Sequence, residues 1–77
     1  MPIRVTVTLF GALRQTAGAA ELQLELEAGA SVRDAILACG LPDRVDIWAL
    51  VDGERADRGQ VVRDGCQVNL FQPVGGG

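Results

Sequence analysis

Apolar and polar residues alternate along two stretches near the start of the chain, which is the pattern of strands buried on one side. In residues 3–10 the odd positions are Ile, Val, Val and Leu, and the even positions are Arg, Thr, Thr and Phe. In residues 22–26 three leucines alternate with Gln and Glu. We expect two paired strands here, joined by a turn-bearing connection over residues 11–20.

A helical spacing replaces this alternation after residue 30. Ser31 and Asp34 stand three positions apart and resemble a capping box, which predicts that a helix begins there. Gly40 and Pro42 then provide a stop signal. The apolar residues between these signals recur at three- and four-residue spacing and give the helix one apolar face: Val32, Ala35, Ile36 and Cys39.

The second half of the chain contains two further strand signals. Residues 47–51 form a short apolar run that predicts a strand, and Asp52-Gly53 is typical of a tight turn. Residues 54–60 are polar and loop-like, and Val61-Val62 predicts a short edge element. The last strand is expected over residues 67–72, ended by Pro73. We expect Trp48 to pack in the core.

The order of these elements is strand, strand, helix, strand, short strand, strand. It predicts an α+β domain in which one main helix crosses one face of a mixed sheet of four to five strands, with the first and last strands side by side. A chain of 77 residues has room for one small core. We place the folded domain at residues 1–74 and a flexible glycine tail at residues 75–77.

That tail, Gly75-Gly76-Gly77, is poorly suited to folding, because glycine buries no side chain and costs backbone entropy to order. Extended, three residues reach roughly 10 Å beyond the last strand. A slim chain of this kind fits a narrow channel, and an unbranched carboxylate at its tip is easily approached by another enzyme. We expect Gly77 to be the reactive group; the alternative is a frayed terminus without function.

The composition excludes several function classes. All seven basic residues are arginine, so no side-chain amine is available for a Schiff base or for accepting an isopeptide bond. Histidine and tyrosine are absent and Ser31 is the only serine, so we do not expect a self-contained enzyme. The net charge is −3 and no basic run exists, which disfavours nucleic-acid binding.

Targeting and metal-binding signals are equally scarce. No apolar run approaches the ~20 residues that span a membrane, and no signal-peptide pattern is present, so we expect a cytoplasmic protein without a membrane role. Cys39 and Cys66 lack the spacing of metal ligands. We expect no metal site, and both cysteines as small apolar residues in a reducing compartment.

Three segments of the sequence match the pattern of a known family. They are residues 9–18 (LFGALRQTAG), residues 62–74 (VRDGCQVNLFQPV) and the terminal Gly76-Gly77. Together they resemble the ubiquitin-like sulfur-carrier family (MoaD/ThiS), and residues 9–18 and Pro73-Val74 are closest to the MoaD type, the small subunit of molybdopterin synthase. Cys66 and Gln67 depart from the acidic residues common there. The resemblance implies the β-grasp (ubiquitin-like) fold.

The resemblance also implies a reaction at Gly77. An E1-like adenylyltransferase of the MoeB or ThiF type adenylates its carboxylate, using ATP and magnesium bound by that partner and not by this chain. A sulfurtransferase or cysteine desulfurase then supplies sulfur for a thiocarboxylate. Gly75 and Gly76 form the slim backbone that threads the partner channels.

The sulfur of such a carrier passes to a biosynthetic enzyme. For a MoaD-type protein this is the large, MoaE-type subunit of molybdopterin synthase, which gives molybdenum cofactor biosynthesis and a heteromeric complex. The ThiS-type alternative serves a thiazole synthase in thiamine synthesis. Two other functions stay open: a protein modifier joined through Gly77 to lysines of other proteins, and an interaction module with an inert tail.

Partner docking is expected beside the tail. By alternation, Phe10 and Phe71 lie on the sheet face opposite the core, and adjacent strands would expose both rings together near Pro73. An exposed apolar patch there suits a partner subunit. The alternative is that a bend or a loop covers both rings within the domain itself.

Overall fold

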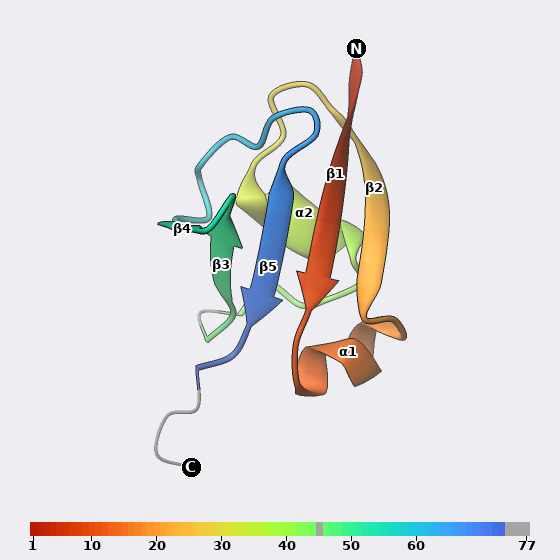
Figure 1. The fold of residues 1–77 in the computed structure, drawn as a ribbon, viewed down its shortest axis with the longest axis vertical. Coiled ribbons are helices and arrows are strands. Elements are labelled where there is room, and N and C mark those ends of the chain that lie inside the picture. The colour runs from red at the N-terminus through yellow and green to blue at the C-terminus, as the bar shows by residue number, and fades with distance from the viewer. Residues whose placement is uncertain (45, 74–77) are drawn as a thin grey trace.

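The structure is a computed structural model that describes residues 1–44 and 46–73. Within these residues five strands form one mixed sheet in the order β2-β1-β5-β3-β4 (Figure 1). The predicted boundary between domain and tail, after residue 74, lies outside the described residues. The strands are β1 (Pro2–Leu9), β2 (Glu21–Glu27), β3 (Trp48–Val51), β4 (Glu54–Ala56) and β5 (Gln67–Phe71).

The first and last strands lie side by side, as predicted from the sequence. β1 and β5 are parallel, with Leu9 opposite Leu70, and β1 is also antiparallel to β2. On its other side β5 is antiparallel to β3, with Trp48 opposite Phe71. The C-terminal end of β5 is therefore held by a strand on each side, which fixes the point from which the chain continues toward its C-terminus.

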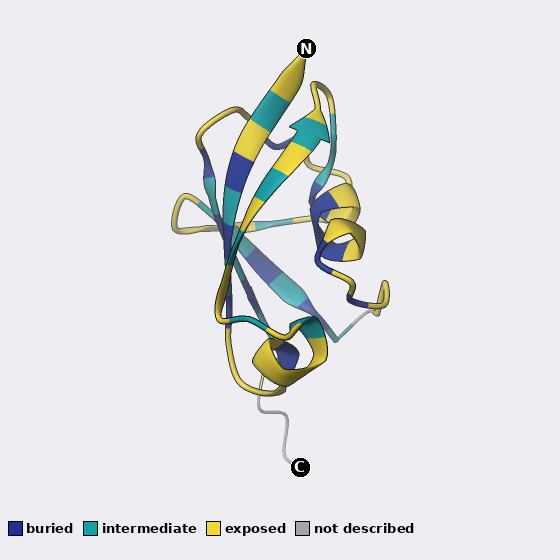
Figure 2. Cartoon of the chain, turned by 90° about the vertical axis from the view of Figure 1, so that its right-hand side faces the viewer, coloured by how far each residue is buried: buried dark blue, intermediate teal, exposed yellow. Residues whose placement is uncertain are grey.

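Helix α2 (Val32–Ala38) crosses one face of this sheet (Figures 1 and 2). It begins with the predicted capping box: the Asp34 N–H donates to Ser31 Oγ at 3.3 Å, and the Ser31 N–H donates to Asp34 Oδ2 at 2.8 Å. Both bonds satisfy amide groups that have no partner within the helix. Gly40, with φ of 82°, ends the helical segment in the conformation that glycine adopts most easily.

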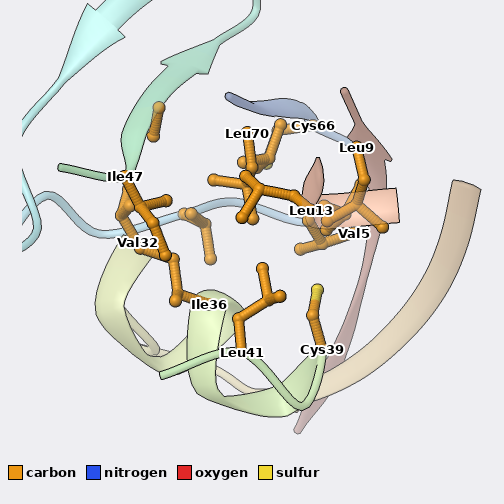
Figure 3. Packing of buried hydrophobic residues seen from close by; sticks show 14 residues of the cluster. Val5, Leu9, Leu13, Val32, Ile36, Cys39, Leu41, Ile47, Cys66 and Leu70 are labelled. Carbon is orange, nitrogen blue, oxygen red and sulfur yellow. The ribbon is translucent and has the colours of Figure 1, made fainter. Parts of the chain in front are cut away.

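The core lies between α2 and the sheet (Figure 3). Cys39 and Cys66 are both part of it, 6% and 5% exposed, and both are free thiols, as predicted. Burial raises the pKa of the Cys39 thiol to about 11. The largest fully buried side chains come from the sheet, from α2 and from the segments beside them: Leu9, Ile36, Ile47, Leu70, Val5, Val7, Val32, Val62 and Val68.

Residues 11–20 differ from the expected connection, because they contain the short helix α1 (Ala12–Ala17). Leu13 is its buried residue and packs against the core, and Gly18 closes it with φ of 79°. A helix of six residues shows too little periodicity to be recognised, since a single turn carries only one or two apolar anchors. Tertiary contact through Leu13 stabilises it instead.

Residues 54–60 also differ from the prediction of a loop, because their first three residues form the strand β4. The Asp52-Gly53 turn, with positive φ at both residues (50° and 88°), joins β3 and β4 into a hairpin, as its sequence signal indicated. β4 is polar because it lies at the edge of the sheet. The short element expected at Val61-Val62 is reduced to one bridge between Val61 and Ser31.

Candidate functional site

The C-terminal end of β5 lies at the same end of the sheet as the end of β1, helix α1 and the start of β3 (Figure 1). Phe71 ends β5, and the exposed Pro73 is the last residue that the structure describes. The predicted carrier Gly77 and the predicted channel residues Gly75 and Gly76 lie outside the described residues. The candidate site is therefore the surface around the root of the tail.

Phe71 and Trp48 form an aromatic pair on the sheet face opposite α2, which we call the open face. Their ring centroids are 6.2 Å apart and their planes are inclined by 57°, a tilted arrangement that aromatic rings favour. The guanidinium carbon of Arg55, on β4, lies 3.6 Å from the centroid of the Trp48 ring. This is a cation–π contact, and it places a positive charge beside the aromatic pair.

The expectation that Trp48 packs in the core is wrong. Its neighbours Ile47 and Ala49 are 1% and 3% exposed and occupy the core-facing positions, so strand alternation places Trp48 on the open face. There it is half-buried. All of residues 47–51 are apolar, so the sequence shows no alternation there that would reveal which positions face the core.

Phe10 follows directly after β1 and is 44% exposed. Its N–H donates to Leu70 O at 3.1 Å, so the backbone at Phe10 is tied to the end of β5. Leu9 is opposite Leu70, so strand alternation assigns the residues that follow them, Phe10 and the half-buried Phe71, to the open face. We call Phe10, Trp48 and Phe71 the aromatic surface.

The rest of the open face is polar toward β2. Gln67 Nε2 donates to Thr8 Oγ1 at 2.8 Å and to Asn69 Oδ1 at 3.1 Å, so these side chains satisfy one another. Thr6 Oγ1 donates to Gln23 Oε1 at 3.3 Å. The Trp48–Phe71 pair and the backbone of Phe10 thus lie at the end of the open face where β5 ends.

A second feature of the tail root was missed by the sequence analysis. Gln72 Nε2 donates to Asp46 Oδ2 at 3.0 Å. Asp46 also accepts from Arg44, from Nε to Oδ1 at 3.2 Å and from Nη2 to Oδ2 at 3.3 Å. No spacing signal predicts this cluster, because its residues come from the segment before β3 and from the residue after β5.

Residues 1–44 and 46–73 contain no group of three or more histidine, cysteine or carboxylate side chains placed to hold a metal ion. Nor does any helix in these ranges have the length and apolarity to cross a membrane.

The described fold is a ubiquitin-like β-grasp domain whose last strand ends beside an aromatic surface. The family model described as the ThiS family matches residues 7–77, and the chain belongs to this family. These proteins are ubiquitin-like sulfur carriers or modifiers and work with E1-like and synthase partners. The predicted fold and the predicted family resemblance are both confirmed.

Three solved structures illustrate the likeness. A candidate molybdopterin converting factor, subunit 1, from Pyrococcus furiosus is 30% identical, with 94% of this chain and 99% of that chain covered and a TM-score of 0.82. The small archaeal modifier protein 1 of H. volcanii is 26% identical, with 94% and 99% covered and a TM-score of 0.82. A ubiquitin from Caldiarchaeum subterraneum, at 18% identity, shares the fold, with 100% of both chains covered and a TM-score of 0.65. No curated protein matches the chain.

Proposed function

We propose that this protein is a sulfur carrier for molybdopterin synthesis, with its C-terminal Gly77 as the carrier group. The observation that carries the proposal is the match to the ThiS family over residues 7–77, which includes the terminal glycines. The molybdopterin branch is favoured by residues 9–18 and by the 30% identity to the molybdopterin converting factor candidate. Family and fold support the carrier class, and the pathway is our inference.

The proposed reaction uses Gly77 as substrate of a partner enzyme. A carboxylate is a poor electrophile, so an E1-like adenylyltransferase of the MoeB or ThiF type first joins it to AMP from ATP, with release of pyrophosphate. A sulfurtransferase or cysteine desulfurase carries the sulfur as a persulfide, and a thiol, itself oxidised to a disulfide, reduces it to the oxidation level of sulfide. This sulfur then displaces AMP and leaves a thiocarboxylate. ATP and magnesium belong to the activating enzyme, and this chain contributes the acyl group and its presentation.

The aromatic surface, together with Pro73, is the proposed docking site for these partners. Phe10 is 44% exposed, and the Trp48–Phe71 pair lies at the root of the tail. Burying such rings supplies much of the binding energy at protein interfaces. Arg55, stacked on Trp48, favours an acidic group on the partner. A partner enzyme that docks here would hold the root of the tail at a fixed distance from its own reaction centre.

Intact mass spectrometry of the protein purified from its native host tests the carrier function. We expect a population that is heavier by the mass difference between sulfur and oxygen, and that disappears when Gly76-Gly77 is deleted. A host that keeps normal cofactor synthesis after this deletion would show that the carrier proposal is wrong. A pull-down then separates the pathways: a MoaE-type subunit supports the molybdopterin branch, and a thiazole synthase supports the ThiS-type branch.

A second candidate function is protein modification through Gly77. It is favoured by the 26% identity to small archaeal modifier protein 1 over 94% of this chain. The same preparation distinguishes it, because a modifier is recovered in covalent bonds to lysines of larger proteins. The absence of lysine from this chain means that its own side chains could not extend such a conjugate into an isopeptide-linked chain.

A further inference from the structure

Among the residues that the structure describes, the hydrogen bond nearest to the C-terminus joins two side chains. Gln72 Nε2 donates to Asp46 Oδ2 at 3.0 Å. The ladder between β5 and β3 ends one residue earlier, at the pair of Trp48 and Phe71. Pro73, the next residue, has no N–H with which to continue a ladder. The side chain of Gln72 is thus the described link between the sheet and the start of the tail.

The acceptor of this bond is itself held in place. Arg44 donates from Nε and Nη2 to the two oxygens of the Asp46 carboxylate, at 3.2 and 3.3 Å. The residue that follows, Ile47, is 1% exposed and anchors the backbone beside Asp46 in the core. A carboxylate also accepts a stronger hydrogen bond than a neutral oxygen does. The ion pair is exposed, with 61% of the Arg44 side chain and 45% of the Asp46 side chain open to solvent, so it contributes little, and the buried Ile47 rather than Arg44 fixes Asp46 as the charged anchor for Gln72.

We propose that Asp46 is a positioning residue, which orients Gln72 so that the C-terminal segment leaves the sheet in one direction. This inference rests on the proposed function, because it assigns Asp46 a role in presenting Gly77 to the activating enzyme. A segment whose root is already oriented loses less conformational entropy when it enters a partner channel. Pro73, with its fixed φ, transmits that orientation by one further residue.

The role concerns binding rather than the chemical step. Gly77, which carries the proposed reacting carboxylate, lies five positions after Gln72, so Asp46 acts through Gln72 on where the segment lies. Removing the anchor should raise the KM for this protein as a substrate of the activating enzyme and leave kcat unchanged. A residue that served only the stability of the domain would produce no such split.

The first experiment measures the anchor in the isolated protein by ¹⁵N relaxation. In Asp46→Ala we expect the backbone order parameter of Gln72 to fall from about 0.85, the value of rigid backbone, to below about 0.6. Asp46→Asn keeps an oxygen that accepts from Gln72 and should keep the order parameter high. Arg44→Ala is the matched control, because it removes the ion pair of Asp46 and leaves the bond to Gln72.

The second experiment measures adenylation of the same variants by the E1-like enzyme of the native host. For Asp46→Ala we expect a KM raised about three- to tenfold, the range of one lost hydrogen bond, with kcat unchanged. Asp46→Asn and Arg44→Ala should stay near the wild-type KM. Gln72→Ala should match Asp46→Ala, and the double variant should be no worse than either single variant, because both remove the same contact.

The outcomes separate this inference from the proposed function. An unchanged KM in Asp46→Ala overturns the positioning role, whether or not Gln72 has become mobile. An unchanged order parameter overturns the anchor itself, and the Gln72→Ala variant checks that result without altering Asp46. If the wild-type protein is adenylated and the variants behave alike, the proposed function stands and only the inference fails. If the wild-type protein is not adenylated, both fail.

Discussion

Phe71 and Trp48 lie on the open face because of strand alternation. Their neighbours Leu70 and Ala49 fill the core, so each ring is left on the opposite side, where it contacts the other ring instead of the interior. The same parity brings Phe10 to this face at the end of β1. Trp48 and Phe71 thus meet without any motif that links them in sequence, and the backbone of Phe10 is tied to the residue before Phe71.

Replacing Trp48 by alanine should weaken partner binding while lowering the stability of the domain only modestly. The ring is half-buried and contacts Phe71 and Arg55, so we expect a stability loss of about 1 kcal/mol in urea unfolding. Affinity for the activating enzyme, measured by calorimetry, should fall at least about tenfold if the aromatic surface is the docking site. Thr6→Ala, on the polar half of the open face, is the control and should leave affinity unchanged. Equal affinities for both variants would place the docking site elsewhere.

Cys39 predicts how stability depends on alkaline pH. Burial raises the pKa of its thiol from its ordinary value of 9.0 to about 11, so the folded state favours the neutral thiol. This contribution is fully present below pH 9, and it is lost as the pH rises through 11, because the unfolded chain can then release a proton that the folded chain retains. The free energy of unfolding should fall over this range by up to about 3 kcal/mol.

The control for this prediction is Cys39→Ala. Part of the alkaline loss of stability should disappear in this variant, which has no thiol to ionise at this position. Below pH 9 the folded wild-type protein should also react with iodoacetamide at Cys39 more slowly than after denaturation, because the thiolate is the nucleophile. Equal rates in the two states would contradict the burial of this thiol.

At the scale of elements, the sequence predicts those whose own signals agree with their surroundings. β1 and β2 alternate, and α2 carries both a capping box and an apolar face. Helix α1 could not be predicted, since it depends on Leu13 contacting a core that only the folded chain provides. β4 could not be predicted either, because an edge strand with exposed side chains is as polar as a loop.

The candidate site also combines features that have a local sequence signal with contacts that arise only in the folded chain. Phe10 and Phe71 could be assigned to one face from alternation alone, and the glycine tail from composition. Asp46 could not be connected to Gln72, because their bond requires the segment before β3 to fold back beside the end of β5. Contacts of this kind depend on tertiary structure, whereas strand parity is local.

The capping box of α2 leads to a prediction about the stability of a single element. Ser31→Ala removes the Oγ acceptor that satisfies the Asp34 N–H, and we expect it to lower the free energy of unfolding by about 1 kcal/mol. Gln15→Ala, at an exposed position of α1, should change it by no more than about 0.5 kcal/mol. Urea unfolding followed by circular dichroism measures both. A Ser31→Ala variant as stable as wild type would mean that water replaces the cap without loss.

At the scale of the whole molecule, the two ends of the sheet have different roles. The chain starts at one end of β1, whereas the end of β5, helix α1 and the aromatic surface lie at the other (Figure 1). Met1 is 96% exposed and belongs to the end remote from the tail root. Additions at the N-terminus therefore extend away from the proposed docking site, while additions after Gly77 change the proposed reacting group itself.

This polarity predicts an asymmetry between tagged proteins. A chain with an N-terminal affinity tag should be adenylated by the activating enzyme with kcat/KM within about twofold of wild type, because the tag touches neither the aromatic surface nor the tail. A chain with one alanine added after Gly77 should not be adenylated productively, because the slim glycyl carboxylate is no longer terminal. Both proteins should have the same Tm, so that a difference in rate cannot come from unfolding. An N-terminal tag that abolishes adenylation would mean that the partner contacts the end of the sheet where β1 begins, and the tail root would then not be the docking site.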